Sequence, residues 1–429
     1  MAGARWRQDD IYVRRRRMVL ALVVLLVVVA AGSTIAVWRS FSSDPPAAAA
    51  GTDGSGSPDS SSGGSESSSA PKPPAQDGPS SGTTLQRIDR FTGGITPKSV
   101  DASQRGLVIA NNMMYSHTVT LYDSRSRKLL KKLPDSVDLS KFGINGHPGI
   151  SKGAPVEAAW TKDGKYAYVS QYTMYGTGFG KEGWDDCTSD SGVGSSYLYR
   201  FNADTMDWDQ VIPVGAVPKY VAITPDQSKV VVSNWCDFTI SVVDRASAKQ
   251  TKVIKIGQQP RGIVILPDNR TAYVAAMYGN KVFKVDLQAG TTTLIKDVYR
   301  PRHLVLSPDA KYVYLAASGT NTVYKIDTAT DKTVAQVISG PEPRSMTISA
   351  DGTALYTVNY FGASVSKIST ADMKVVGRVP TDESPIGITY DDTTRQVWVA
   401  CYGGSMLVFD DCKKAAGASG SPSAPATSG

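Results

Sequence analysis

The stretch from Gln259 to Val298 reads QPRGIVILPDNRTAYVAAMYGNKVFKVDLQAGTTTLIKDV, and it decides the fold. It contains four apolar runs in which every second residue is apolar, separated by the turn-forming sequences PDN, YGN and QAGT. Alternation with a period of two is typical of β-strands, and short polar turns between such strands indicate antiparallel pairing. The stretch therefore predicts one four-stranded antiparallel sheet.

Similar text recurs along the chain. Close copies begin at Arg300 (RPRHLVLSPDAKYVYLAASGTNTVYKIDTATDKTVAQV) and at Glu342 (EPRSMTISADGTALYTVNYFGASVSKISTADMKVVGRV). A repeat of about 42 residues is typical of a closed array of sheets. A proline opens each unit, and the last five prolines are spaced by 42, 41, 42 and 42 residues: Pro97, Pro155, Pro218, Pro260, Pro301, Pro343 and Pro385.

The two ends of the array predict how it closes. The seventh unit has three strands and ends near Asp410, whereas residues 85–91 (LQRIDRF) form a single strand-like run ahead of the first unit. Pairing these two fragments completes one sheet and removes the exposed edges of an open repeat. Because Val, Thr, Tyr, Ser and Gly also suit strands, we predict an all-β fold, a seven-bladed β-propeller at residues 85–412.

The repeats also resemble a known family. Each has a proline, a strand, PDG or a variant of it, YV followed by a small residue and Asn, and a strand ending in Val or Ile and Asp. This order is visible in VPKYVAITPDQSKVVVSNW from Val217, at Pro260 and Pro301, and in ADGTALYTVNY from Ala350. It resembles the prokaryotic YVTN repeat propellers over roughly residues 85–411, although units one and two depart from the pattern. The resemblance implies a propeller in an extracytoplasmic setting and no single activity.

The chain ahead of the ring predicts a membrane anchor. Residues 1–17 form a polar, Arg-rich leader, and residues 18–38 (MVLALVVLLVVVAAGSTIAVW) are long and apolar enough to cross a bilayer as a helix. Because four arginines precede this segment, the positive-inside rule predicts a single-pass protein of the cell membrane with a cytoplasmic N-terminus and an extracellular propeller. The alternative is a signal peptide cleaved near Val29, Ala30 and Ala31; the full spanning length favours a retained anchor.

Two further segments have the composition of flexible chain. Residues 39–84 are rich in Ser, Gly and Pro, and residues 413–429 share this composition. Such sequences contain too few large apolar residues to offset the entropy lost on folding. We therefore predict a disordered stalk at 39–84, which spans roughly 35–40 Å, and a disordered tail at 413–429.

The predicted site lies on one face of the ring. In such a blade the loop before the first strand and the loop between strands two and three share a face, here called the top face. Both long insertions fall on it: residues 135–153 precede the first strand of blade two, and residues 172–196 join its second and third strands. Long loops on a rigid scaffold commonly carry function, although a structural cap is the alternative.

The residue after each opening proline predicts a cationic ring. At the start of the innermost strand, such side chains point toward the mouth of the central channel, where they would attract an anion. The alternative is that each cation pairs with an aspartate or a backbone carbonyl of the neighbouring blade. Five of the seven positions are basic, namely Lys98, Lys219, Arg261, Arg302 and Arg344, and the other two are Val156 and Ile386.

The end of the second strand predicts ligand-binding amides and aromatic rings beside these cations. Such groups suit a carbohydrate, a nucleotide or a cell-wall polymer, although blade packing favours the same residue types. The net charge of +7 includes Arg14 to Arg17, so the ring is only mildly basic and nucleic acid is not favoured as a partner. The residues are Asn111, Asn234 and Asn359, with Tyr172, Trp235, Tyr360 and Tyr402.

The cysteines predict one disulfide. Cys187 lies in the blade-two insertion and Cys236 at the matching loop of blade three, so both belong to the top face of adjacent blades. A disulfide between them is favoured in an oxidising exterior. Cys401 and Cys412 lie at opposite ends of a predicted hairpin strand, too far apart to bond each other.

No cofactor is predicted. With three histidines in the chain, a His-rich copper or haem centre is excluded. Asp185, Asp186 and Asp190 cluster in WDDCTSD, but their spacing matches no standard calcium loop, so a solvated acidic turn is favoured over a Ca²⁺ site. GFGKEG matches GxGxxG without a strand before it or a helix after it, so it does not indicate a dinucleotide site.

These observations favour a non-enzymatic binding propeller outside the cell. Its top face would hold an anionic small molecule, a carbohydrate, a cell-wall polymer or a partner protein. The alternative is an enzyme of the lactonase, lyase or cyclase type, because similar-looking propellers house such sites, with Glu157, His117, His147 and Asp186 as its acid and base. A structural surface protein without a ligand is the third interpretation.

Overall fold

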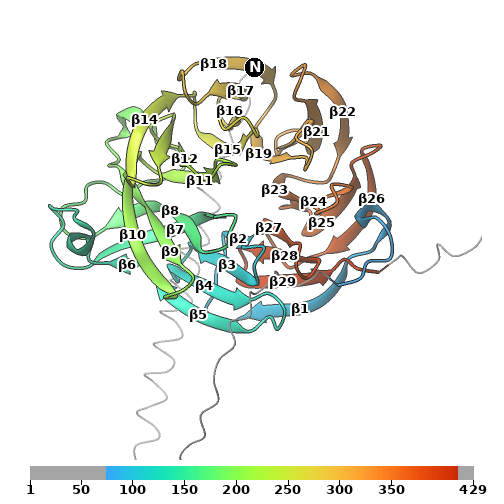
Figure 1. The fold of residues 1–429 in the computed structure, drawn as a ribbon, viewed down its shortest axis with the longest axis horizontal. Helices are drawn as coiled ribbons and strands as arrows, with labels where there is room; N and C mark the ends of the chain where they lie inside the picture. Colours follow the sequence, from blue (N-terminus) through green and yellow to red (C-terminus); the bar gives the residue numbers. More distant parts are fainter. Residues whose placement is uncertain (1–73, 414–429) are drawn as a thin grey trace, which may run out of the picture. The chain divides into compact units, whose positions relative to one another are not determined.

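The computed structural model describes residues 74–413, which form a ring of seven antiparallel β-sheets (Figure 1). The predicted all-β, seven-bladed propeller is therefore confirmed. In Figure 1 the first strand of each blade lies nearest the centre of the ring and the fourth lies at the rim. Within residues 74–413 no helix has the length and apolar character needed to span a bilayer. The predictions for residues 1–38, for the stalk up to residue 73 and for the tail from residue 414 lie outside the described residues.

Five of the blades are regular four-stranded sheets whose strands pair in chain order. Blade one consists of β2 (Ser99–Ala102), β3 (Leu107–Asn112), β4 (Thr118–Asp123) and β5 (Leu129–Pro134). Blade three has β11 (Pro218–Ile223), β12 (Lys229–Asn234), β13 (Thr239–Asp244) and β14 (Lys249–Lys255), and blade four has β15 (Pro260–Ile265), β16 (Thr271–Ala276), β17 (Lys281–Asp286) and β18 (Thr292–Asp297). Blade five has β19 (Pro301–Leu306), β20 (Tyr312–Ala317), β21 (Thr322–Asp327) and β22 (Thr333–Ile338), and blade six has β23 (Pro343–Ile348), β24 (Ala354–Asn359), β25 (Ser364–Ser369) and β26 (Lys374–Pro380).

Blade two is the irregular one. It consists of β7 (Ser151–Trp160), β8 (Tyr166–Tyr175), β9 (Ser196–Asn202) and β10 (Asp207–Val214), with β6 (Ser136–Val137) paired to β7 as a fifth strand. The first insertion also contains the 3₁₀ turn η2 (Leu139–Phe142), and the second contains η3 (Ser189–Ser191). Val137, Leu139 and Met174 bury their side chains in the blade-two core. The insertions are therefore packed extensions of the blade.

The core lies between neighbouring blades. Tyr168 of β8 packs with Val221 and Val230 of blade three, and Tyr314 of β20 packs with Leu355 of blade six. These side chains come from the alternating positions of the strands, which face the adjacent sheet. Each blade thus buries its apolar faces against two neighbours, which makes the ring a rigid frame for its central channel.

The seventh blade is closed by the N-terminal strand, as predicted. β27 (Pro385–Asp391), β28 (Gln396–Cys401) and β29 (Ser405–Asp410) are completed by β1 (Gln86–Thr92), which pairs antiparallel with β29. Closure of the ring therefore depends on backbone hydrogen bonds between segments more than 300 residues apart in the chain.

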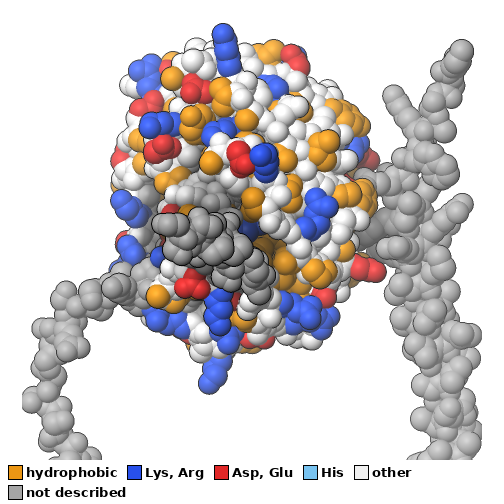
Figure 2. All heavy atoms as spheres, turned by 90° about the vertical axis from the view of Figure 1, so that its right-hand side faces the viewer, with side chains coloured by type: hydrophobic (Ala, Val, Ile, Leu, Met, Phe, Trp, Pro, Cys, Tyr) orange, Lys and Arg blue, Asp and Glu red, His pale blue; other side chains and the backbone are white. Residues whose placement is uncertain are grey.

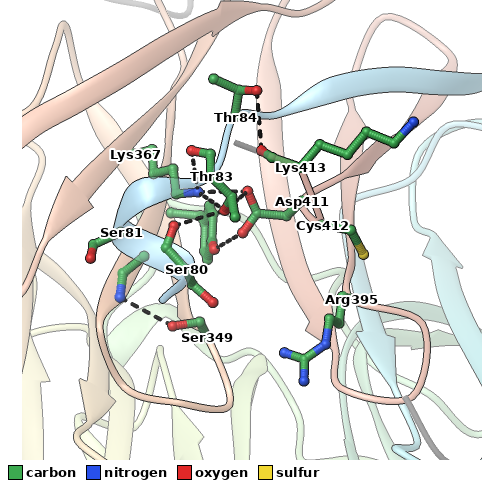
Figure 3. Close-up of polar contacts among 12 residues, drawn as sticks. Ser80, Ser81, Thr83, Thr84, Ser349, Lys367, Arg395, Asp411, Cys412 and Lys413 are labelled. Carbon is green, nitrogen blue, oxygen red and sulfur yellow. Dashed lines mark hydrogen bonds and ion pairs between the residues drawn. The ribbon is translucent and has the colours of Figure 1, made fainter. Parts of the chain in front are cut away.

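The boundary of the ring lies earlier than predicted. The 3₁₀ turn η1 (Ser80–Gly82), placed in the stalk from its composition, docks on blade six, where the backbone N–H of Ser80 donates to Asp351 Oδ2 at 2.8 Å. Close by, Thr83 Oγ1 donates to Asp411 Oδ1 at 2.9 Å, and Lys367 Nζ lies 2.6 Å from the same oxygen (Figure 3). The amino-acid composition did not predict this docking, because η1 is held by hydrogen bonds of small polar residues and not by burial of apolar side chains.

A repeated turn fixes the top of the inner strands. The residue before each of the last five opening prolines has a positive φ, as in Gln259 (φ 48) and Glu342 (φ 55). The carbonyl of Gln259 accepts the backbone N–H of Met277 at 2.9 Å, and that of Glu342 accepts the N–H of Tyr360 at 3.0 Å. These hydrogen bonds join the start of the first strand to the end of the second strand. This turn holds the residue after the proline at the channel mouth.

Candidate functional site: the channel mouth and the chamber below it

The structure brings the five predicted cations to the mouth of the channel. Lys98, Lys219, Arg261 and Arg302 are buried, with 4–7% of each residue exposed, and Arg344 is half-buried. Burying charge is costly unless it is compensated by counter-charges or hydrogen bonds. The partners of the five cations therefore decide what the mouth can bind.

Glu157 is the first of these partners. Its Oε1 lies 3.2 Å from Lys98 Nζ and 3.2 Å from Arg261 Nη2. Burial tends to raise the pKa of Glu157, but the two cations outweigh burial and hold it below its usual range. Glu157 is thus an anion at neutral pH, and it sits two residues after Pro155, in the blade whose own ring position holds the uncharged Val156.

Lys219 is paired by the blade-two insertion. Its Nζ lies 2.8 Å from Asp185 Oδ1 and over two aromatic rings, 4.1 Å from the centroid of Tyr172 and 4.8 Å from that of Trp235. Trp235 Nε1 donates to the backbone carbonyl of Asp185 at 2.8 Å, which fixes the loop over the lysine. Because 67% of the Asp185 side chain is exposed, water screens this ion pair.

Arg344 and Arg302 differ although they occupy the same position in adjacent blades. Arg344 pairs with Glu342 at 2.6 Å and stacks on Tyr360 at 3.3 Å from the ring centroid. Arg302 donates from Nε to the carbonyl of Arg344 at 3.2 Å, and its Nη1 lies 3.7 Å from Met277 Sδ. Among residues 74–413 no carboxylate lies within ion-pair distance of Arg302. Burial, and then the like charges of Arg261 and Arg344, hold its pKa well below the usual range.

The predicted amides and aromatic rings have mostly intramolecular partners. Asn111, Asn234 and Asn359 are fully buried and donate to hydroxyl groups of their own blades, as Asn234 does to Ser241 at 2.8 Å. Tyr402 is half-buried, with its hydroxyl 3.9 Å from Met113 Sδ. The rings of Tyr172, Trp235 and Tyr360, in contrast, lie against the mouth cations.

Beneath the mouth lies a chamber of about 170 Å³. Its polar side chains stand two residues after an opening proline (Ser99, Glu157, Tyr220, His303, Ser345) or four residues after one (Asp101, Thr347, Thr389). The inner strands present every second residue to the axis, which explains this spacing. Sequence reasoning missed Asp101, Tyr220 and His303 as site residues. Alignment of the repeats offered a signal for them, because Tyr220 and His303 stand two residues after an opening proline and Asp101 stands four residues after one.

The chamber perturbs its titratable groups. Burial, and then the charge of Glu157, raises the pKa of Asp101 to about 7, so that this carboxyl keeps its proton to a much higher pH than an ordinary aspartate. Burial lowers the pKa of His303 to about 4, so the imidazole is neutral there. Perturbed groups of both kinds in one cavity are typical of a functional site. Because Glu157 touches the mouth cations and also lines the chamber, mouth and chamber are contiguous.

The residues expected to serve an enzyme are dispersed. His117 Nδ1 lies 3.4 Å from Asp135, and His147 stacks on Phe179 at 3.9 Å between ring centroids. The structure does not bring these two histidines to Glu157. Asp186 is exposed in the second insertion. Asp185, Asp186 and Asp190 do not gather: within the described part of the chain, no three acidic, histidine or cysteine side chains form a cluster able to hold a metal ion.

The disulfide between Cys187 and Cys236 is confirmed. It joins the second insertion to the top of blade three, and the carbonyl of Cys187 accepts from Gln259 Nε2 of blade four at 3.1 Å. The insertion is thus fixed to two further blades beside the mouth. Cys401 and Cys412 are free thiols, the first buried and the second partly exposed.

Elsewhere on the ring, charge is less concentrated. The side of the ring near β22 and β26, drawn in Figure 2, carries basic and acidic side chains interspersed with apolar ones. At the opposite end of the channel a hollow of about 340 Å³ is lined by Arg105, Lys162, Asp163, Gln227 and Arg245, of which Arg105 and Lys162 are exposed to solvent. The mouth is where four buried cations lie together.

Fold and site together define a seven-bladed β-propeller with a basic channel mouth on its top face. A sequence model of the family described as YNCE-like beta-propeller matches residues 210–359, which run from β10 to the end of β24. The chain is thus similar to that family over blades three to five and parts of their neighbours. No curated protein matches the chain. The finer resemblance to YVTN repeat propellers stays a prediction.

Proposed function

We propose that the protein is a non-enzymatic binding propeller that holds an anionic ligand at the mouth of its channel. Arg302 is the observation that carries this proposal, because its buried guanidinium has a carbonyl and a thioether as partners where its neighbours have carboxylates. A ligand carboxylate or phosphate would supply the missing counter-charge through paired N–H donors. Five cations share three carboxylates at the mouth, Glu157, Asp185 and Glu342, so a monoanion is accommodated without excess negative charge.

Calorimetric titration of the full-length chain with butyrate and with inorganic phosphate tests this proposal. We expect saturable binding of at least one of them, and we expect Arg302→Met to weaken it roughly 10- to 100-fold, which corresponds to the loss of charge-assisted hydrogen bonds. Arg270→Met is the matched control, because Arg270 is an exposed arginine paired with Asp286 away from the channel. Equal affinity of wild type and Arg302→Met would contradict the proposal. Titration with an acidic wall polymer then shows whether the anionic group belongs to a small molecule or to a polymer.

We also infer that the ring is displayed outside the cell on an anchor at residues 18–38. The two ends of the described chain support this, since the backbone N–H of Asp77 donates to the carbonyl of Cys412 at 3.0 Å and that of Thr84 to Lys413 at 2.9 Å. Both ends lie at the face opposite the mouth, so a chain segment joined there does not obstruct the mouth. The disulfide favours an oxidising compartment.

Labelling of intact cells tests this topology. Tyr115 is 82% exposed on a top loop, so Tyr115→Cys in a Cys412→Ser background should react with a membrane-impermeant maleimide. The Cys412→Ser chain alone is the control for background labelling. Labelling that requires lysis of the cells would overturn the extracellular placement.

A further inference from the structure

The chamber contains a hydrogen-bond relay whose direction is fixed by the backbone. His303 Nδ1 lies 2.9 Å from the backbone nitrogen of Met346, and its Nε2 lies 3.2 Å from the Tyr220 hydroxyl. A backbone N–H can only donate, so Nδ1 is the acceptor and carries no proton. The neutral imidazole therefore holds its proton on Nε2 and donates it to the oxygen of Tyr220.

The relay leaves Tyr220 as a donor toward the chamber. Its oxygen accepts from His303, so its own proton is directed elsewhere, and among residues 74–413 no other side chain or carbonyl is bonded to this hydroxyl. Tyr220 lines the chamber, and burial keeps its pKa above the usual range, so the hydroxyl stays protonated. A polar group held in one direction at a cavity wall selects a ligand atom of the complementary kind.

The carboxyl groups near Tyr220 limit the charge of the ligand group that can enter the chamber. Glu157 directs Oε1 to Lys98 and Arg261, so it belongs to the mouth as much as to the chamber. Asp101 has a weak contact, 3.5 Å, to Thr389 Oγ1. A second negative group in the chamber would meet Glu157 and the carboxyl of Asp101, so the part of a ligand that enters should be uncharged.

We propose that the ligand is a small acid with an uncharged carbonyl group next to its anionic group, and that Tyr220, oriented by His303, donates a hydrogen bond to that carbonyl. This inference rests on the proposed anion site, because the anionic group would lie among Arg261, Arg302 and their neighbours while the carbonyl enters the chamber. No covalent step is involved. His303 acts through Tyr220 and is a positioning residue.

A pair of probes separates the two sites. Butyrate carries the anionic group alone, whereas 2-oxobutyrate adds one carbonyl beside it. For the full-length wild type we expect 2-oxobutyrate to bind about 5- to 10-fold more tightly than butyrate, the contribution of one hydrogen bond. Tyr220→Phe should reduce this ratio to about one. Tyr324→Phe, which removes a hydroxyl bonded to Thr320 outside the chamber, should leave the ratio unchanged.

Each outcome decides between the two proposals. A ratio near one in the wild type, with both acids bound, overturns the carbonyl site and leaves the anion site standing. Binding of neither acid nor phosphate overturns both. Nitrogen-15 NMR of the imidazole gives a measurement without ligand: we expect the neutral Nε2–H tautomer for His303 at pH 7, and the Nδ1–H tautomer or the charged ring would overturn the relay. In Tyr220→Phe the same tautomer should persist, since Met346 still donates to Nδ1.

Discussion

Two buried cations at opposite faces of the ring differ in how neighbouring groups compensate their charge. Lys367 is 2% exposed where blade six meets the closing blade, and its Nζ lies 2.6 Å from Asp411 Oδ1 and 2.8 and 2.7 Å from two oxygens of Thr83 (Figure 3). Arg302 is 7% exposed at the mouth and has the carbonyl of Arg344 and a thioether near it. The first site is complete within the protein, and the second lacks an anion.

The difference separates structure from function. A buried charge whose donors are all satisfied fixes local geometry and takes part in the closure of the ring. A buried charge without a counter-ion opposes folding unless something else compensates it. Removal of Lys367 should therefore damage the fold, whereas removal of Arg302 should damage ligand binding. The same substitution at both positions makes this comparison quantitative.

The largest effect is expected for Lys367→Met. It leaves Asp411 buried without its cation, which should cost about 3–5 kcal/mol of the free energy of unfolding. Denaturant unfolding followed by tryptophan fluorescence measures this loss. In Lys367→Met/Asp411→Asn no charge remains, so part of the stability should return. A loss below about 1 kcal/mol in the single variant would show that the buried pair is not what holds the closing segment.

The next largest effect is expected for Cys187→Ser/Cys236→Ser. The disulfide closes a loop with a sequence separation of 49, and such a link contributes about 2–4 kcal/mol. Without it the insertion is free to leave Lys219, because Asp185 belongs to that insertion. Lys219 would then resemble Arg302, a buried cation without a carboxylate. Unfolding curves of the variant and of the oxidised wild type measure the loss, and coincident curves would contradict it.

Asp101 gives a smaller, pH-dependent effect. Its pKa of about 7 in the folded protein lies above the ordinary aspartate value, so the folded state binds this proton more tightly than the unfolded state. The stability that Asp101 contributes is therefore full in acid and is lost as the pH rises through about 7. Asp101→Asn cannot ionise, so its free energy of unfolding relative to wild type should rise by about 2–3 kcal/mol between pH 5 and pH 8, which melting temperatures at the two pH values would show. A difference in stability between the two proteins that does not change with pH would contradict this prediction. His303 is present in both proteins, so its titration does not account for a change in that difference.

The ring could be predicted from the sequence because the pattern of a blade is contained in a short stretch and is repeated along the chain. One blade can be recognised from its four alternating runs, the opening prolines count the blades, and the unpaired strand at residues 85–91 shows how the ring closes. The cations of the mouth could be predicted for the same reason, because five of the seven residues that follow an opening proline are basic. The docking of η1 was not predicted, because Ser80 and Thr83 bind through hydrogen bonds that composition does not reveal.

The chamber was not predicted because its chemistry is shared among blades. The column two residues after each proline contains Ser99, Glu157, Tyr220, Gly262, His303, Ser345 and Gly387, so no single residue type marks it. Its members meet only when the ring closes; Tyr220 and His303 come from blades three and five. Which cation lacks a partner likewise depends on Glu157 and Asp185 in the irregular blade two, whose side-chain directions the repeat does not specify.

The smallest effect on stability is expected for Arg302→Met. The methionine replaces an aliphatic stem of similar length and leaves no carboxylate unpaired, while it relieves repulsion from Arg261 and Arg344. Against this, the carbonyl of Arg344 loses one donor. These terms oppose each other, so the free energy of unfolding should change by less than about 1 kcal/mol, with either sign. Denaturant unfolding without added anion, in parallel with Lys367→Met, measures it. A loss as large as that of Lys367→Met would mean that Arg302 is a structural charge like Lys367, and the contrast between the two faces would fail.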